Sequence, residues 1–143
     1  MIQKLSAFFI LAAASMGLPL VASAATGYVT VSTGQTLYIS VSGTSDANIS
    51  IVNLASHQTL VTATAYHFTP YVLTGTAYTP VSFVSDGSGN AHVTGLPAGN
   101  YAVNFTGSQM SDYADDYGTN YADMGLFDPN DSSVFMECDV DIY

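Results

Sequence analysis

The stretch DGSGNAHVTGLPAGNYAVNF (residues 86–105) holds two alternating segments, each preceded by turn residues. The first is AHVT at 91–94 and the second is YAVNF at 101–105; in both, apolar side chains occupy every second position. The intervening GLPAGN at 95–100 has the glycine and proline content that is typical of a tight turn. This arrangement predicts two antiparallel strands joined by a short connection.

The same alternation recurs towards the N-terminus. Further segments of this kind lie at 28–32, 37–41, 49–52, 60–66 and 81–84. Pro70 and Pro80 bracket residues 71–79, which predicts an edge strand or a loop, because proline cannot donate a ladder hydrogen bond. We see no helical periodicity in this region, and turn residues recur at short intervals. We therefore expect an all-β fold, an antiparallel β-sandwich.

The first 24 residues predict a secretory signal peptide. Lys4 supplies the positive end, residues 7–14 are an apolar run, and ASA at 22–24 is a small-residue cleavage site. Cleavage after Ala24 leaves a chain of single-domain size. No later apolar run is long enough to span a bilayer, so we expect no membrane insertion of the mature chain. The expected location is extracellular, cell-surface or periplasmic.

Charge is distributed very unevenly along the chain. The sequence has a single lysine or arginine, Lys4, against 11 acidic residues. Between residues 25 and 111 the only acids are Asp46 and Asp86, and all the others follow. A mature chain without strong cations cannot clamp phosphate or present a basic patch, so it is not expected to bind nucleic acid or anionic lipid.

Residues 86–103 resemble a hallmark of prealbumin-like β-sandwiches, including the carboxypeptidase-regulatory-like and Cna-B-type repeats of secreted bacterial proteins. These domains show an acidic or glycine turn, an alternating strand, a Leu-Pro-x-Gly-x-Tyr turn and another strand. The resemblance covers residues 27–106 and implies a prealbumin- or Ig-like sandwich over a body at 25–106. The Lys–Asn isopeptide bond of many Cna-B-type domains cannot form here, because the mature chain has no lysine.

The C-terminal part lies outside this pattern. Residues 107–133 are rich in aspartate, tyrosine and glycine and predict a long acidic, tyrosine-rich loop. Residues 134–143 alternate cleanly and predict a last strand, with Cys138 on its apolar face and the acids on the other. The expected architecture is thus a sandwich with an acidic C-terminal extension, in which Cys138 is a buried thiol.

Two candidate sites lie in this extension. Calcium prefers six to eight oxygen ligands, and the acids of the loop could supply them, although their spacing does not match an EF-hand and a solvated acidic loop is the alternative. The candidate ligands are Asp112, Asp115, Asp116, Asp123, Asp128 and Asp131. Tyr113, Tyr117 and Tyr121 could form a stacking platform for sugars or for neighbouring subunits.

No motif for catalysis is visible. His57, His67 and His92 are far apart in the sequence and no nucleophile elbow is present, so we predict no enzyme. The expected function is that of a secreted structural or adhesive surface protein that self-assembles into a filament or matrix, with calcium ordering the acidic loop. The alternative is an extracellular module that binds carbohydrate or another ligand.

Overall fold

The computed structural model describes residues 23–67, 71–107 and 110–143, and within them every regular element is a β-strand. The strands are β1 (Ser23–Val31), β2 (Leu37–Gly43), β3 (Ala47–Asn53), β4 (Thr59–Tyr66), β5 (Val72–Ala77), β6 (Ser82–Ser85), β7 (Asn90–Thr94), β8 (Gly99–Gly107), β9 (Asp112–Gly118), β10 (Tyr121–Asp128) and β11 (Asp131–Ile142). All the strands expected from alternation are present, and within residues 71–79, expected as an edge strand or a loop, Val72–Ala77 forms the edge strand β5.

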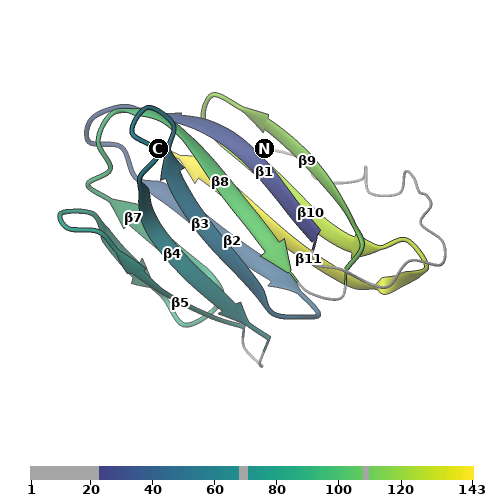
Figure 1. Ribbon diagram of the computed structural model, residues 1–143. Helices are drawn as coiled ribbons and strands as arrows, with labels where there is room; N and C mark the ends of the chain where they lie inside the picture. The colour runs from purple at the N-terminus through teal and green to yellow at the C-terminus, as the bar shows by residue number, and fades with distance from the viewer. Residues whose placement is uncertain (1–22, 68–70, 108–109) are drawn as a thin grey trace.

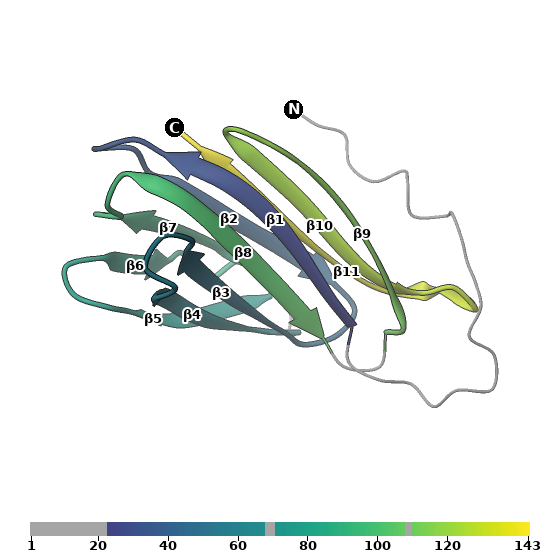
Figure 2. The same cartoon turned by 45° about the horizontal axis from the view of Figure 1, so that its top comes forward.

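The strands form two antiparallel sheets that stack as two layers (Figure 1 and Figure 2). Sheet A has the order β1-β8-β3-β4-β5, and sheet B has the order β6-β7-β2-β11-β10-β9. The chain changes sheet several times, so neighbours in space such as β1 and β8 are far apart in sequence. The prediction of an all-β sandwich is confirmed.

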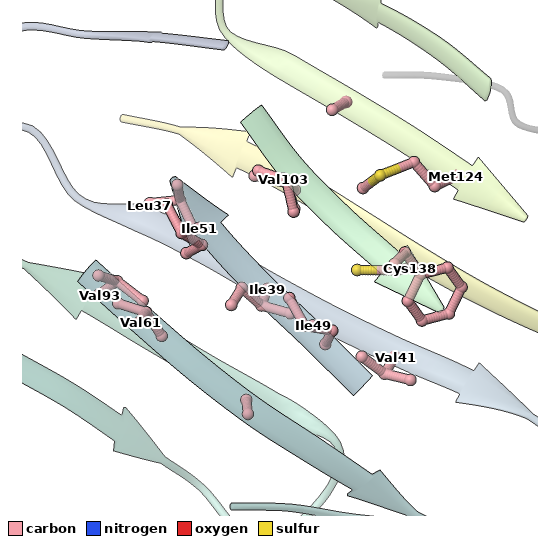
Figure 3. Packing of buried hydrophobic residues seen from close by; sticks show 14 of the residues in the cluster. Leu37, Ile39, Val41, Ile49, Ile51, Val61, Val93, Val103, Met124 and Cys138 are labelled. Carbon is pink, nitrogen blue, oxygen red and sulfur yellow. The ribbon is translucent and has the colours of Figure 1, made fainter. Parts of the chain in front are cut away.

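The core lies between the sheets and is built by alternate residues of each strand. Figure 3 shows Ile39 and Val41 of β2 close to Ile49 and Ile51 of β3, with Val103 of β8 nearby. All five side chains are buried. Removing an aliphatic side chain of this size from water contributes about 1.5–3 kcal/mol, so this layer is the main source of stability.

The turn between β7 and β8 packs against this core. Leu96 and Tyr101, on the two sides of the turn, are both buried. The Tyr101 hydroxyl donates a hydrogen bond to the carbonyl oxygen of Pro97 at 2.5 Å. Gly95 has φ +81°, a left-handed conformation that glycine adopts at no steric cost.

The prediction of a long loop at residues 107–133 is wrong. β9 and β10 form a hairpin there, in which Gly118 pairs with Tyr121 across a turn at 119–120. β10 lies inside sheet B between β9 and β11, and its Ala122, Met124 and Leu126 are buried. Aspartate and glycine have low strand propensity, but β10 still forms a strand because its alternate apolar residues are buried on one face.

The last strand is confirmed, and it begins at Asp131 rather than at residue 134. Met136, Cys138, Val140 and Ile142 are buried, which fixes the register of β11. From Met136 to Ile142, β11 is paired with β10 on one side and with β2 on the other, so this part of the strand offers no open edge to a neighbouring molecule. Burial raises the pKa of the Cys138 thiol, which is inaccessible in this fold.

The N-terminal strand closes one side of the sandwich. β1 begins at Ser23, two residues before the predicted cleavage point, and residues 1–22 lie outside the described residues. A Cβ atom on Gly27 would lie 2.5 Å from the Cβ of Ala122, so only glycine lets β1 approach β10 this closely. The Thr30 amide also donates to the Thr119 carbonyl at 2.8 Å, which links β1 to the β9–β10 turn.

The described residues contain no helix with the length and hydropathy needed to cross a membrane.

Candidate functional site

The two sheets differ sharply in charge. None of the five strands of sheet A contains an aspartate or a glutamate. All the acids after residue 111 lie in β9, β10 and β11, which are adjacent in sheet B. The acidic segment of the sequence is therefore one half of one sheet, and each sheet presents a different chemistry to the solvent.

The outer face of sheet A carries two rows of hydroxyl and amide side chains that run across the strands. The first row crosses all five strands and comprises Thr26, Asn104, Ser50, Thr62 and Thr76. The second crosses four strands and comprises Thr106, Asn48, Thr64 and Thr74. Both rows result from the antiparallel register, which places outward residues of neighbouring strands opposite each other.

Hydrogen bonds between side chains hold these rows in place. Thr26 donates to the amide oxygen of Asn104 at 2.9 Å, and the amide nitrogen of Asn104 donates to the Ser50 hydroxyl at 3.2 Å. In the second row, Thr64 donates to the amide oxygen of Asn48 at 3.0 Å. These hydrogen bonds hold the polar side chains of neighbouring strands in fixed orientations.

A shallow groove lies over these rows. It has a volume of about 490 Å³, and the side chains of both rows line it from β8 to β5. A second hollow of about 200 Å³ shares Thr62 and Thr76 with the first and extends to Tyr78. Together they form one trough, which we call the neutral groove.

Two exposed tyrosines lie in and near the neutral groove: Tyr78 lines its second hollow, and Tyr66 lies two residues beyond Thr64 on β4. Tyr66 ends β4 on the outward face and is 40% exposed. Tyr78 follows β5, is 58% exposed, and its amide donates to the Leu60 carbonyl at 2.8 Å. Tyr66 is six positions along β4 from Leu60, so the backbone positions of the two tyrosines are about 20 Å apart along the strand direction.

The outer face of sheet B carries a row of carboxylates instead. Asp123 of β10 pairs with Asp116 of β9 on one side and with Asp139 of β11 on the other. Asp123 is only 4% exposed. Tyr121, on the same face, donates from its hydroxyl to Asp116 at 3.2 Å. We call Asp116, Asp123 and Asp139 the acidic row.

The structure brings together only two of the six predicted calcium ligands, Asp116 and Asp123. Asp115 lies on the opposite face of β9, where it pairs with Met124. Asp128 accepts a hydrogen bond from the Asn130 amide at 2.9 Å, and Asp131 accepts one from the Ser133 hydroxyl at 2.6 Å. These last two acids therefore organise the β10–β11 turn.

Asp112, the remaining predicted ligand, pairs with Phe127 at the start of β9. In the part of the chain that the structure describes, no group of three or more histidine, cysteine, aspartate or glutamate side chains is arranged to hold a metal ion.

The three predicted partner-binding tyrosines do not form one platform. Tyr117 packs edge-to-face on Tyr28 of β1, with ring centroids 5.2 Å apart. Tyr113 is on the same face of β9 as Tyr117 and is exposed, whereas Tyr121 is on the outward face of β10. The hairpin separates Tyr121 from the other two.

A different aromatic cluster lies on the outer face of sheet B. The Tyr38 ring centroid lies 4.3 Å from that of His92 and 5.0 Å from that of Tyr143. Tyr38, Ser40, Asp141 and Tyr143 line a shallow cleft of about 470 Å³. Alternation alone would place Tyr38 and Tyr143 outward, but only the pairing of β2 with β11 brings them together.

No family model matches the chain, and no curated protein or solved structure matches it at a significant level.

Proposed function

We propose that this chain is an exported adhesion module that binds an uncharged polysaccharide along the neutral groove of sheet A. The observation that carries the proposal is the pair of side-chain rows, in which five neighbouring strands present hydroxyl and amide groups and no charge. A sugar chain is the polymer whose surface has the same chemistry, because each of its hydroxyls both donates and accepts hydrogen bonds.

The neutrality of the groove favours an uncharged ligand. A charged side chain would lose hydration on contact with a neutral polymer, and that loss is costly unless a charged partner replaces the water. Hydroxyl and amide groups lose less hydration energy, and they regain hydrogen bonds from the ligand. The groove therefore suits a neutral glycan better than an anionic or a cationic one.

The exposed tyrosines suit the ends of a bound segment. Aromatic rings offer large, flat surfaces on which sugar rings can stack; Tyr78 lines the groove, and Tyr66 lies two residues beyond its lining residue Thr64 on β4. A linear glycan that follows β4 and β5 would contact polar side chains in the middle and an aromatic ring at each end.

The wider identity of the module is also part of this proposal. The predicted signal peptide supports export, and the buried Leu96 and Tyr101 on the two sides of the β7–β8 turn support a prealbumin-like relationship. An adhesive function at the cell surface agrees with both. We propose no catalytic role.

Binding to a panel of neutral and acidic polysaccharides tests the proposal. Thr62→Val and Thr76→Val together remove two hydroxyls from the centre of the groove and keep the shape and the β-branching of the side chains. Thr94→Val on β7 of sheet B is the matched control, because it is also an exposed strand threonine. We expect wild type and the control to bind a neutral polymer and the double variant to lose most of that binding. Equal binding by all three proteins, or a preference for acidic polymers, would contradict the proposal.

A self-assembling surface protein is the second candidate, and the edge of β5 favours it. β5 ends sheet A and has no charged residue, whereas β9 ends sheet B with three aspartates that oppose edge-to-edge pairing. Light scattering after size-exclusion chromatography would detect assembly. Thr74→Lys on β5 should then release monomers, and the same substitution at Thr94 should not.

A further inference from the structure

The aromatic cluster on the outer face of sheet B has the geometry of a corner. The rings of Tyr38 and Tyr143 are inclined by 88°, with their centroids 5.0 Å apart. On its other side Tyr38 contacts His92, whose ring centroid is 4.3 Å away, and this contact restricts the orientation of Tyr38. The two tyrosine rings thus meet edge to face, and both line the same shallow cleft.

The backbone holds this corner firmly. Tyr143 donates from its amide to the Thr36 carbonyl and accepts from the Thr36 amide, both at 2.9 Å. Asp141 is the direct cross-strand neighbour of Tyr38, and it lines the same cleft as the two tyrosines. The carboxylate and the two rings are consequently placed by strand pairing and not by a loop.

The chemistry of the corner suits an organic cation. A positive group is attracted to the face of an aromatic ring when it lies within about 6 Å of the ring centroid, and a group seated in the corner satisfies this condition for both tyrosines. Asp141 adds a negative charge at the border of the cleft. The described residues include no lysine or arginine, so no strongly basic side chain of this chain competes for the position.

We infer that the cleft formed by Tyr38, Asp141 and Tyr143 is a binding site for an alkylammonium group, such as the trimethylammonium group of choline. The site lies on the opposite sheet from the neutral groove and is independent of the function proposed for that groove. The group occurs in two sources with the same chemistry, free small molecules and the headgroups of choline lipids.

Titration of the mature protein with choline tests the site, with tyrosine ring signals in NMR spectra and the heat of binding as readouts. The chemical control is the uncharged analogue in which a tert-butyl group replaces the trimethylammonium group. It has the same shape without the charge, so it separates attraction of a cation from hydrophobic contact. We expect choline to shift the ring signals of Tyr38 and Tyr143 and the analogue to leave them unchanged.

Two variants at one position sharpen the test. Tyr143 is 70% exposed, so its replacement leaves the core intact. Tyr143→Ala should weaken choline binding roughly ten-fold, whereas Tyr143→Phe, which keeps the ring, should retain most of the affinity. Tyr113→Ala is the matched control, because it removes an exposed tyrosine from β9, outside the cleft.

Vesicles of phosphatidylcholine distinguish the two sources. Co-sedimentation that is lost in Tyr143→Ala would assign the site to a lipid headgroup, and choline binding without co-sedimentation would assign it to a free cation. Either result supports the site. Equal binding of choline and its uncharged analogue, or an unchanged affinity in Tyr143→Ala, would overturn it.

Discussion

The outer face of sheet A is neutral and crossed by hydrogen-bonded hydroxyl and amide groups, whereas the outer face of sheet B carries carboxylates on three adjacent strands. Both faces belong to the same sandwich and cover the same core. On sheet A, neighbours such as Thr64 and Asn48 attract each other through a hydrogen bond of 3.0 Å. On sheet B, the carboxyl groups of Asp116, Asp123 and Asp139 occupy directly opposed positions on three adjacent strands.

This difference has a thermodynamic consequence. Like charges directly opposite in a sheet are destabilising, and the described residues contain no lysine or arginine to compensate them. The acidic strands must therefore be held by their other face, where β10 and β11 bury apolar side chains. Sheet A should be indifferent to pH and salt, whereas the acidic half of sheet B should respond to both.

The largest effect should come from the buried side of the acidic half. Leu126 of β10 is fully buried, and Leu126→Ala should destabilise the whole protein by about 2–5 kcal/mol because it leaves a cavity. Urea denaturation measures the change. Val84→Ala, at an exposed position on β6, is the control, and its effect should be within about 0.5 kcal/mol. If Leu126→Ala left the main transition unchanged, β9 to β11 would be a separate extension.

The strands that the sequence predicted and the strands that it missed differ in composition. β2, with Leu37, Ile39 and Val41, has branched residues in strict alternation, and such segments are recognised without tertiary information. β9 and β10 are rich in aspartate, glycine and tyrosine, which is typical of loops. Met124 and Leu126 alternate in the sequence, but the aspartates and glycine around them have low strand propensity and favour a loop.

The candidate sites were harder to predict than the strands, for a different reason. Each site is made by cross-strand register between distant segments, such as Ser50 with Asn104 or Tyr38 with Asp141. Alternation shows which residues face outward, but it does not show which strands are neighbours. The sequence YAD occurs at 113–115 and again at 121–123, yet the hairpin places Asp115 and Asp123 on opposite faces.

Acidification should stabilise the acidic half of sheet B and leave the stability of sheet A unchanged. Partial burial, and then the charge of Asp116, raise the pKa of Asp115, which remains largely exposed. A raised pKa in the folded state gives stability that is complete below the unfolded value, near 3.9, and is lost as the pH rises through the folded value. Melting temperatures followed by circular dichroism should therefore be higher just above pH 4 than at pH 7.

Two aspartates in turns stabilise the fold less as the pH falls, and they limit the rise in melting temperature. Hydrogen bonds from Asn90 and Ser88 lower the pKa of Asp86, and those from Ser133 lower the pKa of Asp131. Their contributions to the stability of the fold are present above the unfolded pKa and are lost as the pH falls through the pKa values of the folded state. Asp115→Asn should reduce the rise between pH 7 and pH 4. A melting temperature that falls steadily from pH 7 to pH 4 would show that the stability lost at Asp86 and Asp131 exceeds the stability gained at Asp115.

Removal of a hydrogen bond from the neutral face should have a smaller effect that does not depend on pH. Thr64→Val leaves the amide oxygen of Asn48 without its donor and should cost about 0.5–1.5 kcal/mol. No titratable side chain lies in either row, so urea denaturation at pH 4 and at pH 7 should give the same loss. A loss that differed between the two pH values would mean that the faces are electrostatically coupled through the sandwich.

The smallest effect should come from salt. Sodium chloride at 0.5 M should raise the melting temperature at pH 7, because it screens the repulsion between exposed carboxylates, and the gain should be of the order of a few tenths of a kcal/mol. Asp116→Asn should respond less, because one charge of the acidic row is gone.

Calcium chloride at the same ionic strength separates screening from binding. A further rise with calcium alone would support the predicted calcium site among the acids of β9 to β11. Equal curves in the two salts would contradict that prediction and leave screening as the whole effect, since screening at a fixed ionic strength does not depend on which cation provides it.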